Sequence, residues 1–218
     1  TKAIAGALAV VLLSFFYLSS VFGVKLIKSE IPVLKSANVE DAEQWTIKNN
    51  MDSLRLLQEK EWRKLSVDEK LEVLSVVRNI ETSYLGLSYE VYLTVKPTND
   101  VVWGYYDHKE HTVVLNNELL SSGEAEECLH TLCHEMYHAY QNNQVELYQT
   151  VDERYKNMAM FSAARAYEEE FADYISGEDD YFGYLLQDTE RTADQYADEA
   201  VEDYYAKLEA YLEKEKKA

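Results

Sequence analysis

The chain has 218 residues, of which 47% are hydrophobic, and 40 acidic against 21 basic side chains give it a formal net charge of −19. This length and apolar content are sufficient for one packed domain with an appendage. The acidic balance, with no run of Lys or Arg, argues against nucleic acid as a partner, because basic side chains are what bind a phosphate backbone. The two cysteines, Cys128 and Cys133, are spaced for different sides of a helix, so we expect no disulfide and read Cys133 as a buried thiol.

The chain begins with an apolar stretch. No charged residue occurs from Ala3 to Val24, and these 22 residues, as a helix, would span a hydrocarbon core of about 30 Å. We interpret residues 1–24 as a membrane anchor or signal segment, adopting an N-terminal transmembrane helix, with cleavage after Gly23 as the alternative. The flanking lysines leave the topology open. We expect an extracytoplasmic domain, secreted if the segment is cleaved, after a linker over 25–39.

A folded domain is expected over 40–218. Apolar spacing predicts an amphipathic helix over 40–63, and a second helix begins where Ser66 and Glu69 form a capping box and ends at Gly86. Between 88 and 116 the apolar residues alternate instead. This pattern predicts a small antiparallel sheet of about three strands, the last of them over 111–116.

The remainder of the chain returns to helical patterning. We predict helices over 124–142, 149–176 and 178–215; the last carries ten acids against one base between 178 and 203. We interpret it as a helix packed on the domain with a solvated acidic outer face. The expected fold class is α+β and mostly helical. Its small antiparallel sheet would lie beside an active-site helix and a glutamate-bearing helix, with a core over 88–176 and an acidic C-terminal helix over 178–215.

One stretch of the helix over 124–142, HTLCHEMYHAYQ (130–141), has a spacing with a chemical purpose. His134 and His138 are four residues apart, so both imidazoles can point at one metal ion. Glu135 can reach a water at that ion without binding the ion itself. Three defined residues are a short pattern, and a histidine pair on a solvated helix face is the alternative explanation. A catalytic zinc site would need a third protein ligand from another element.

The segment AARAYEEEFADYIS (163–176) offers that ligand. Glu169 and Asp173 are four residues apart and share a side of the predicted helix with Ala166, a small residue that leaves room for a metal. An acid one turn after a ligand can accept the N–H of a ligating histidine and fix its ring. We expect Glu168 and Glu170 to be solvated.

HEMYH (134–138) followed by EEFAD (169–173) resembles the gluzincin group of zinc metallopeptidases, to which thermolysin belongs, with its HExxH and downstream Glu-x-x-x-Asp. The strand ending TVVLN before the motif helix resembles the compact minigluzincins. The resemblance implies a zinc cofactor with His134, His138 and Glu169 as ligands, Glu135 as general base and Asp173 as an acid supporting the ligands.

The combined expectation is a zinc-dependent metallopeptidase that hydrolyses peptide bonds and is anchored to a membrane through its N-terminal segment. A peptide or protein would be the substrate, and the resemblance implies that an exposed edge of strand 111–116 holds it in extended form. The alternative from another class is a non-catalytic membrane-anchored binding or scaffold protein that retains a peptidase-like fold. The sequence predicts no oligomeric state.

Overall fold

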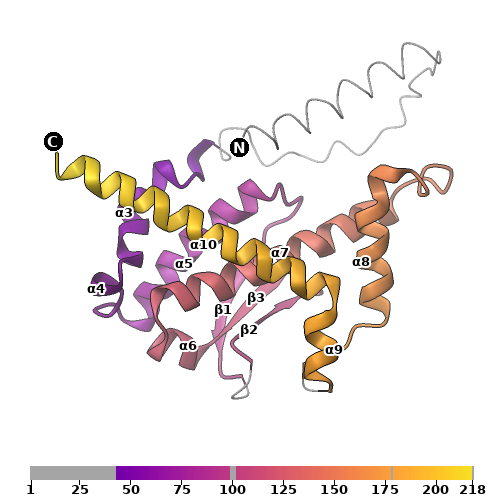
Figure 1. Cartoon of the computed structure of the whole chain (residues 1–218), viewed down its shortest axis with the longest axis horizontal. Coiled ribbons are helices and arrows are strands. Elements are labelled where there is room, and N and C mark those ends of the chain that lie inside the picture. Colours follow the sequence, from indigo (N-terminus) through magenta and orange to yellow (C-terminus); the bar gives the residue numbers. More distant parts are fainter. Residues whose placement is uncertain (1–42, 99–101, 178, 218) are drawn as a thin grey trace, which may run out of the picture. The chain divides into compact units, whose positions relative to one another are not determined.

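A computed structural model describes residues 43–98, 102–177 and 179–217 (Figure 1). All of them lie in one unit that the chain forms from residue 37 onward. The predicted anchor over 1–24 and the linker over 25–39 lie outside the described residues. Among the residues that are described, no helix is both long and apolar enough to cross a bilayer.

The first part of the domain is a series of short turns of helix. Where one helix over 40–63 was predicted, the structure has η1 (Lys48–Asn50), α3 (Met51–Leu54), η2 (Arg55–Leu57) and α4 (Glu59–Trp62). Gln58 interrupts the series because its backbone is extended, with φ −63° and ψ 126°. These turns bury Leu54, Leu57 and Trp62, so packing against the core fixes this broken path.

Helix α5 (Val67–Tyr84) has the predicted start and end. The Ser66 hydroxyl accepts from the Glu69 N–H at 3.3 Å, and the Glu69 carboxylate accepts from the Ser66 N–H at 2.8 Å, so the capping box is confirmed. Gly86 follows with φ +64°, the left-handed conformation that glycine adopts at helix ends.

The sheet has three strands, but it is mixed rather than antiparallel. Strands β1 (Tyr92–Lys96), β2 (Gly104–Asp107) and β3 (Thr112–Asn116) take the order β1-β3-β2. β3 pairs antiparallel with β2 and parallel with β1. The predicted strand 111–116 is therefore the central strand, buried from Val113 to Asn116, and β2 forms an edge in its place.

The helices of the second half differ in length from those predicted. α6 (Asn117–Ser122) was not predicted, and α7 (Ala125–Gln149) continues well past residue 142. The helix expected over 149–176 is reduced to η3 (Ala159–Phe161) and α8 (Ser162–Ala172). The helix expected over 178–215 is divided at Gln187 into α9 (Tyr181–Leu186) and α10 (Asp188–Glu215).

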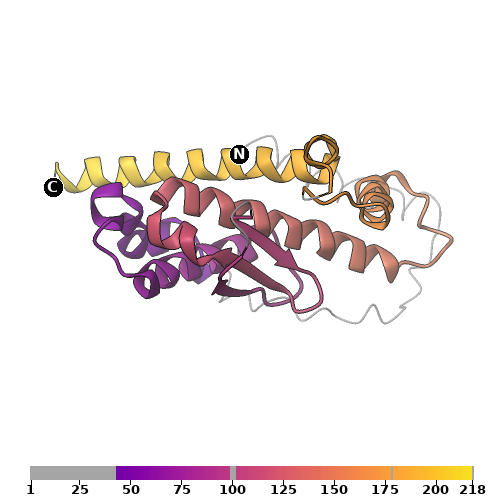
Figure 2. The same ribbon diagram turned by 90° about the horizontal axis from the view of Figure 1, so that it is seen from below.

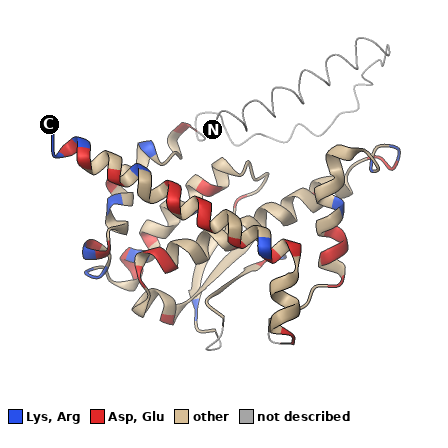
Figure 3. Ribbon diagram, in the orientation of Figure 1, with Lys and Arg blue, Asp and Glu red and all other residues tan. Residues whose placement is uncertain are grey.

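Helix α7 is the centre of the fold. It packs against α10, α8, α5 and the sheet, and Figure 2 shows α10 along one side of it and the strands on the other. Cys128 and Cys133 are both free and buried in this core, as expected for structural thiols. Asp and Glu residues, red in Figure 3, occur along the length of α10, and the buried face of this helix is mostly apolar.

Candidate metal centre

The two histidines of the motif lie together on α7. His134 and His138 direct their Nε2 atoms at each other at 2.9 Å, with His134 buried and His138 largely so. The spacing of four residues produces this meeting because side chains one turn apart stack on a helix. A capping box of Glu124 and Glu127 begins α7, and a long buried stripe holds the helix in place.

The third group comes from the first turn of α10. Glu190 is only 1% exposed, and its Oε2 lies 3.3 Å from His134 Nε2 and 3.4 Å from His138 Nε2. The other oxygen, Oε1, accepts from the Tyr174 hydroxyl at 2.7 Å. The search of the described residues for clusters of His, Cys, Asp and Glu able to hold a metal ion finds this trio, His134, His138 and Glu190.

Two of the three separations match those around a metal ion. Bonds of about 2.0–2.1 Å at tetrahedral angles separate neighbouring ligand atoms by about 3.3–3.4 Å, and both distances to Glu190 fall there, while the two Nε2 atoms lie closer, at 2.9 Å. Glu190 Oε2 is buried and accepts no hydrogen bond from any residue that the structure describes. An orphaned buried carboxylate oxygen is costly. Two imidazoles and a carboxylate around such an atom fit a divalent metal.

The break between α9 and α10 places Glu190. Gln187 is extended, and its side-chain amide bonds the backbone of Ile175 in both directions, at 2.8 and 2.9 Å. Glu170 on α8 then accepts from the N–H groups of Asp188 and Thr189 at 2.8 and 2.7 Å. Because the first N–H groups of a helix have no partner within it, this carboxylate stabilises the start of α10.

The Nδ1 atom of each histidine lies next to a hydrogen-bond acceptor that orients the ring. His134 Nδ1 lies 2.8 Å from Asp194 Oδ1, and His138 Nδ1 lies 2.8 Å from Gln141 Oε1. Asp194 is one turn after Glu190 on α10. Acceptors at both Nδ1 atoms keep protons there and leave the Nε2 lone pairs for a metal.

The electrostatics of the centre favour positive charge. Burial alone would raise the pKa of Glu190, but the two histidines hold it well below its usual range. Burial also opposes protonation of the imidazoles, yet Asp194 and Glu190 raise the pKa of His134 to about 10, and Glu190 raises the pKa of His138. In the metal-free protein, protons therefore occupy the place that a cation would take.

Glu135 interacts electrostatically with the two histidines but is not one of the three candidate ligands. Its side chain is 6% exposed, and burial raises the pKa of its carboxyl against the opposing effect of His134 and His138. A carboxyl group with a raised pKa beside a metal centre is suited to accept and return a proton.

The structure does not bring Glu169 and Asp173 to the histidines. Glu169 is exposed, about 140° around α8 from Ala164, the buried residue of that helix. Asp173 is exposed at the end of α8. Glu190 and Asp194 have the same spacing of four residues, and in the structure these two acids lie at the histidines.

A signal for Glu190 was present in the sequence. The buried positions of α10 recur every three or four residues, and extending that stripe backwards from Ala193 reaches Glu190. A carboxylate on a core-facing stripe calls for a partner, because buried charges are paired or bind metals. The signal was hidden because the predicted helix over 178–215 ran through the break at Gln187, and its acids were assigned together to the solvated face.

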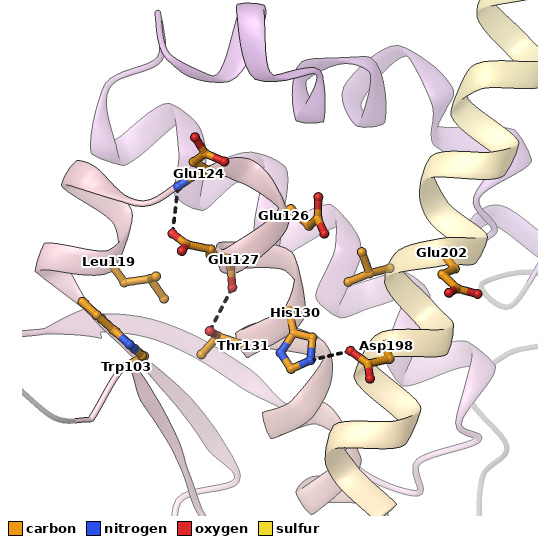
Figure 4. A pocket seen from close by; sticks show the side chains of 10 residues that line it. Trp103, Leu119, Glu124, Glu126, Glu127, His130, Thr131, Asp198 and Glu202 are labelled. Carbon is orange, nitrogen blue, oxygen red and sulfur yellow. Dashed lines mark hydrogen bonds and ion pairs between the residues drawn. The ribbon is translucent and has the colours of Figure 1, made fainter.

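A further histidine–carboxylate pair lies between α7 and α10, one helical turn from His134 and Asp194. His130 Nε2 lies 3.2 Å from Asp198 Oδ1 (Figure 4). The pair lines a groove of about 770 Å³ with Trp103 and the acids Glu124, Glu126, Glu127 and Glu202. His130 is half-buried at this groove.

Comparison with known protein families gives a match to part of the chain. The model of the SprT-like family matches residues 76–156, which is less than half of the chain. The matched range contains the sheet, His134, Glu135 and His138, and it ends before Glu190 and Asp194. No curated protein and no solved structure shows a significant match. The match supports a minigluzincin-type metallopeptidase-like domain, without a specific relation to thermolysin.

Proposed function

We propose that the chain is a zinc-dependent metallopeptidase in which His134, His138 and Glu190 hold the metal. The observation that carries the proposal is the convergence of two Nε2 atoms and one orphaned carboxylate oxygen within 3.4 Å of one another, beside the buried Glu135. Two histidines and one glutamate, with a fourth position left open, form the ligand set of catalytic zinc sites. The SprT-like match over the same helix supports the assignment.

The proposed reaction is hydrolysis of a peptide bond. Zinc, when bound, supplies a Lewis acid for the scissile carbonyl and lowers the pKa of water towards about 7. Glu135 accepts a proton from the attacking water and returns it to the leaving amine, a role that its raised pKa suits at neutral pH. Asp194 and Gln141 keep the imidazole rings turned towards the centre.

A peptide or protein substrate follows from this proposed chemistry. The uncharged stretch from Ala3 to Val24 supports attachment to a membrane, and we propose that the domain lies on the extracytoplasmic side. If the stretch is cleaved, we propose secretion instead.

The variant Glu135→Gln tests the proposal. It keeps the shape of the side chain and the metal ligands but cannot accept a proton, so the protein should retain about one zinc and lose at least about a hundredfold in hydrolysis rate. Glu126→Gln, an exposed change on the same helix, is the matched control and should leave both unchanged. Normal cleavage by Glu135→Gln would exclude the assigned mechanism. Zinc binding by wild type without cleavage of any peptide in a broad library would favour a non-catalytic binding protein.

A further inference from the structure

Gln141 is a fully buried amide on α7, three residues after His138. Its Oε1 lies 2.8 Å from His138 Nδ1, while its Nε2 donates to the Thr189 carbonyl at 2.9 Å and to the Thr192 hydroxyl at 3.1 Å. Thr189 directly precedes Glu190. One side chain therefore contacts the ring of one candidate ligand and the helical turn that carries another.

The hydrogen bonds of Gln141 determine which nitrogen of His138 carries the proton. An amide nitrogen only donates, and the Thr189 carbonyl only accepts, so Nε2 of Gln141 must face Thr189. Its Oε1 must then face His138 and accept from Nδ1–H. His138 Nε2, 3.4 Å from Glu190 Oε2, is then the ring nitrogen at which a metal can take the place of a proton.

We propose that Gln141 is a positioning residue of the metal centre, which sets the tautomer and ring direction of His138 and holds the first turn of α10 so that Glu190 meets both histidines. This inference rests on the proposed function, because it concerns how the same site binds zinc. It adds a residue that donates no ligand atom and that the HExxH spacing does not indicate.

Burial makes Gln141 harder to replace than the acid behind the other histidine. The Asp194 side chain is 52% exposed, so water can take over part of its role at His134. Gln141 is 0% exposed, and water cannot readily fill its place. An apolar residue there leaves His138 Nδ1–H and the Thr189 carbonyl without their partner, and each unsatisfied buried group is costly.

Two variants separate the two contacts of Gln141. Gln141→Leu removes both of them. Gln141→Glu keeps an acceptor for His138 but replaces the donor to Thr189 with a carboxylate, so it breaks the link to α10 while the contact with His138 remains. Asn143→Leu is the matched control, because Asn143 is a buried amide on the same helix whose Oδ1 accepts from Ser88 instead.

The experiment measures zinc dissociation constants of the full chain by chelator competition, with the His138 Nδ1–H resonance of the zinc-loaded protein as a second readout. Gln141→Leu should weaken zinc binding about tenfold to a hundredfold and move the Nδ1–H signal away from its wild-type position, because the proton loses its acceptor. Gln141→Glu should weaken binding but keep that signal. Asn143→Leu should bind zinc within about twofold of wild type, a change well under 1.4 kcal/mol, even if it melts earlier.

The inference is overturned if Gln141→Leu binds zinc as wild type does, or if Asn143→Leu weakens binding equally, because the effect would then be a general loss of packing. A wild-type protein that binds no zinc would instead overturn the proposed function itself. Zinc binding without hydrolysis in wild type would overturn the reaction and leave the role of Gln141 standing.

Discussion

His134 faces the metal centre with Nε2 because Asp194 holds its other ring nitrogen at 2.8 Å. Asp194→Ala should therefore weaken zinc binding about tenfold, the lower end of the range for groups behind a ligand, since water can enter at this half-exposed position. Asp173→Ala is the matched control, because Asp173 has the same place in the other Glu-x-x-x-Asp pair and is exposed. Chelator competition measures both variants, and equal weakening would show that the two acids are not distinguished.

The protonation of the metal-free centre predicts a dependence on pH. The pKa of His134 is about 10, so at neutral pH zinc must displace a proton, and its affinity should rise about tenfold per pH unit between about pH 7 and 9. The folded pKa lies above the unfolded value of about 6.5, so the proton stabilises the metal-free fold fully below that pH. This contribution is lost as the pH rises towards 10. An affinity that stays flat over that interval would contradict the protonated state.

The position of Glu190 depends on where α10 begins. Glu170→Gln keeps the size of the side chain but removes the charge that accepts from Asp188 and Thr189. The loss of a charged cap should lower the free energy of unfolding by about 1–2 kcal/mol and weaken zinc binding. Glu168→Gln is the matched control on the same helix, because Glu168 accepts an exposed hydrogen bond from the Gln149 side chain and caps no helix among the described residues. Denaturant unfolding measures the difference, and equal stability of the two variants would show that the cap is unimportant.

Among the helices and strands, the sequence predicted those features that depend on residues close together in the chain. The capping box at Ser66 and the end at Gly86 are confirmed because both depend on residues within one or two turns. The meeting of His134 and His138 also needs only helical spacing. The break at Gln187 could not be predicted, because the groups that bond its side chain and cap α10 lie on distant segments of the chain.

For the sheet, the sequence predicted the strands but not how they pair. Three strands of alternating apolar residues were predicted, and three are present. The order of the strands was not predicted. In the structure β3 lies between β1 and β2 and pairs parallel with β1. Pairing of strands that are not consecutive depends on what covers the sheet, here α7 and α5.

At the scale of the whole domain, the metal centre joins parts of the chain that meet only after folding. α7 supplies two imidazoles, α10 supplies the carboxylate, and Tyr174, after α8, donates to that carboxylate. A metal bound across these elements would stabilise the fold in proportion to its affinity. Whether Glu169 or Glu190 is the third metal ligand therefore depends on the tertiary structure as well as on the chemistry of the residues.

Zinc content after exhaustive dialysis tests this choice most directly, in wild type, Glu190→Ala and Glu169→Ala. The structure predicts about one zinc in wild type and in Glu169→Ala, where an exposed side chain is removed. Glu190→Ala removes the buried carboxylate between the histidines and should retain little zinc. Full retention by Glu190→Ala together with loss from Glu169→Ala would contradict the account and return the third ligand to α8.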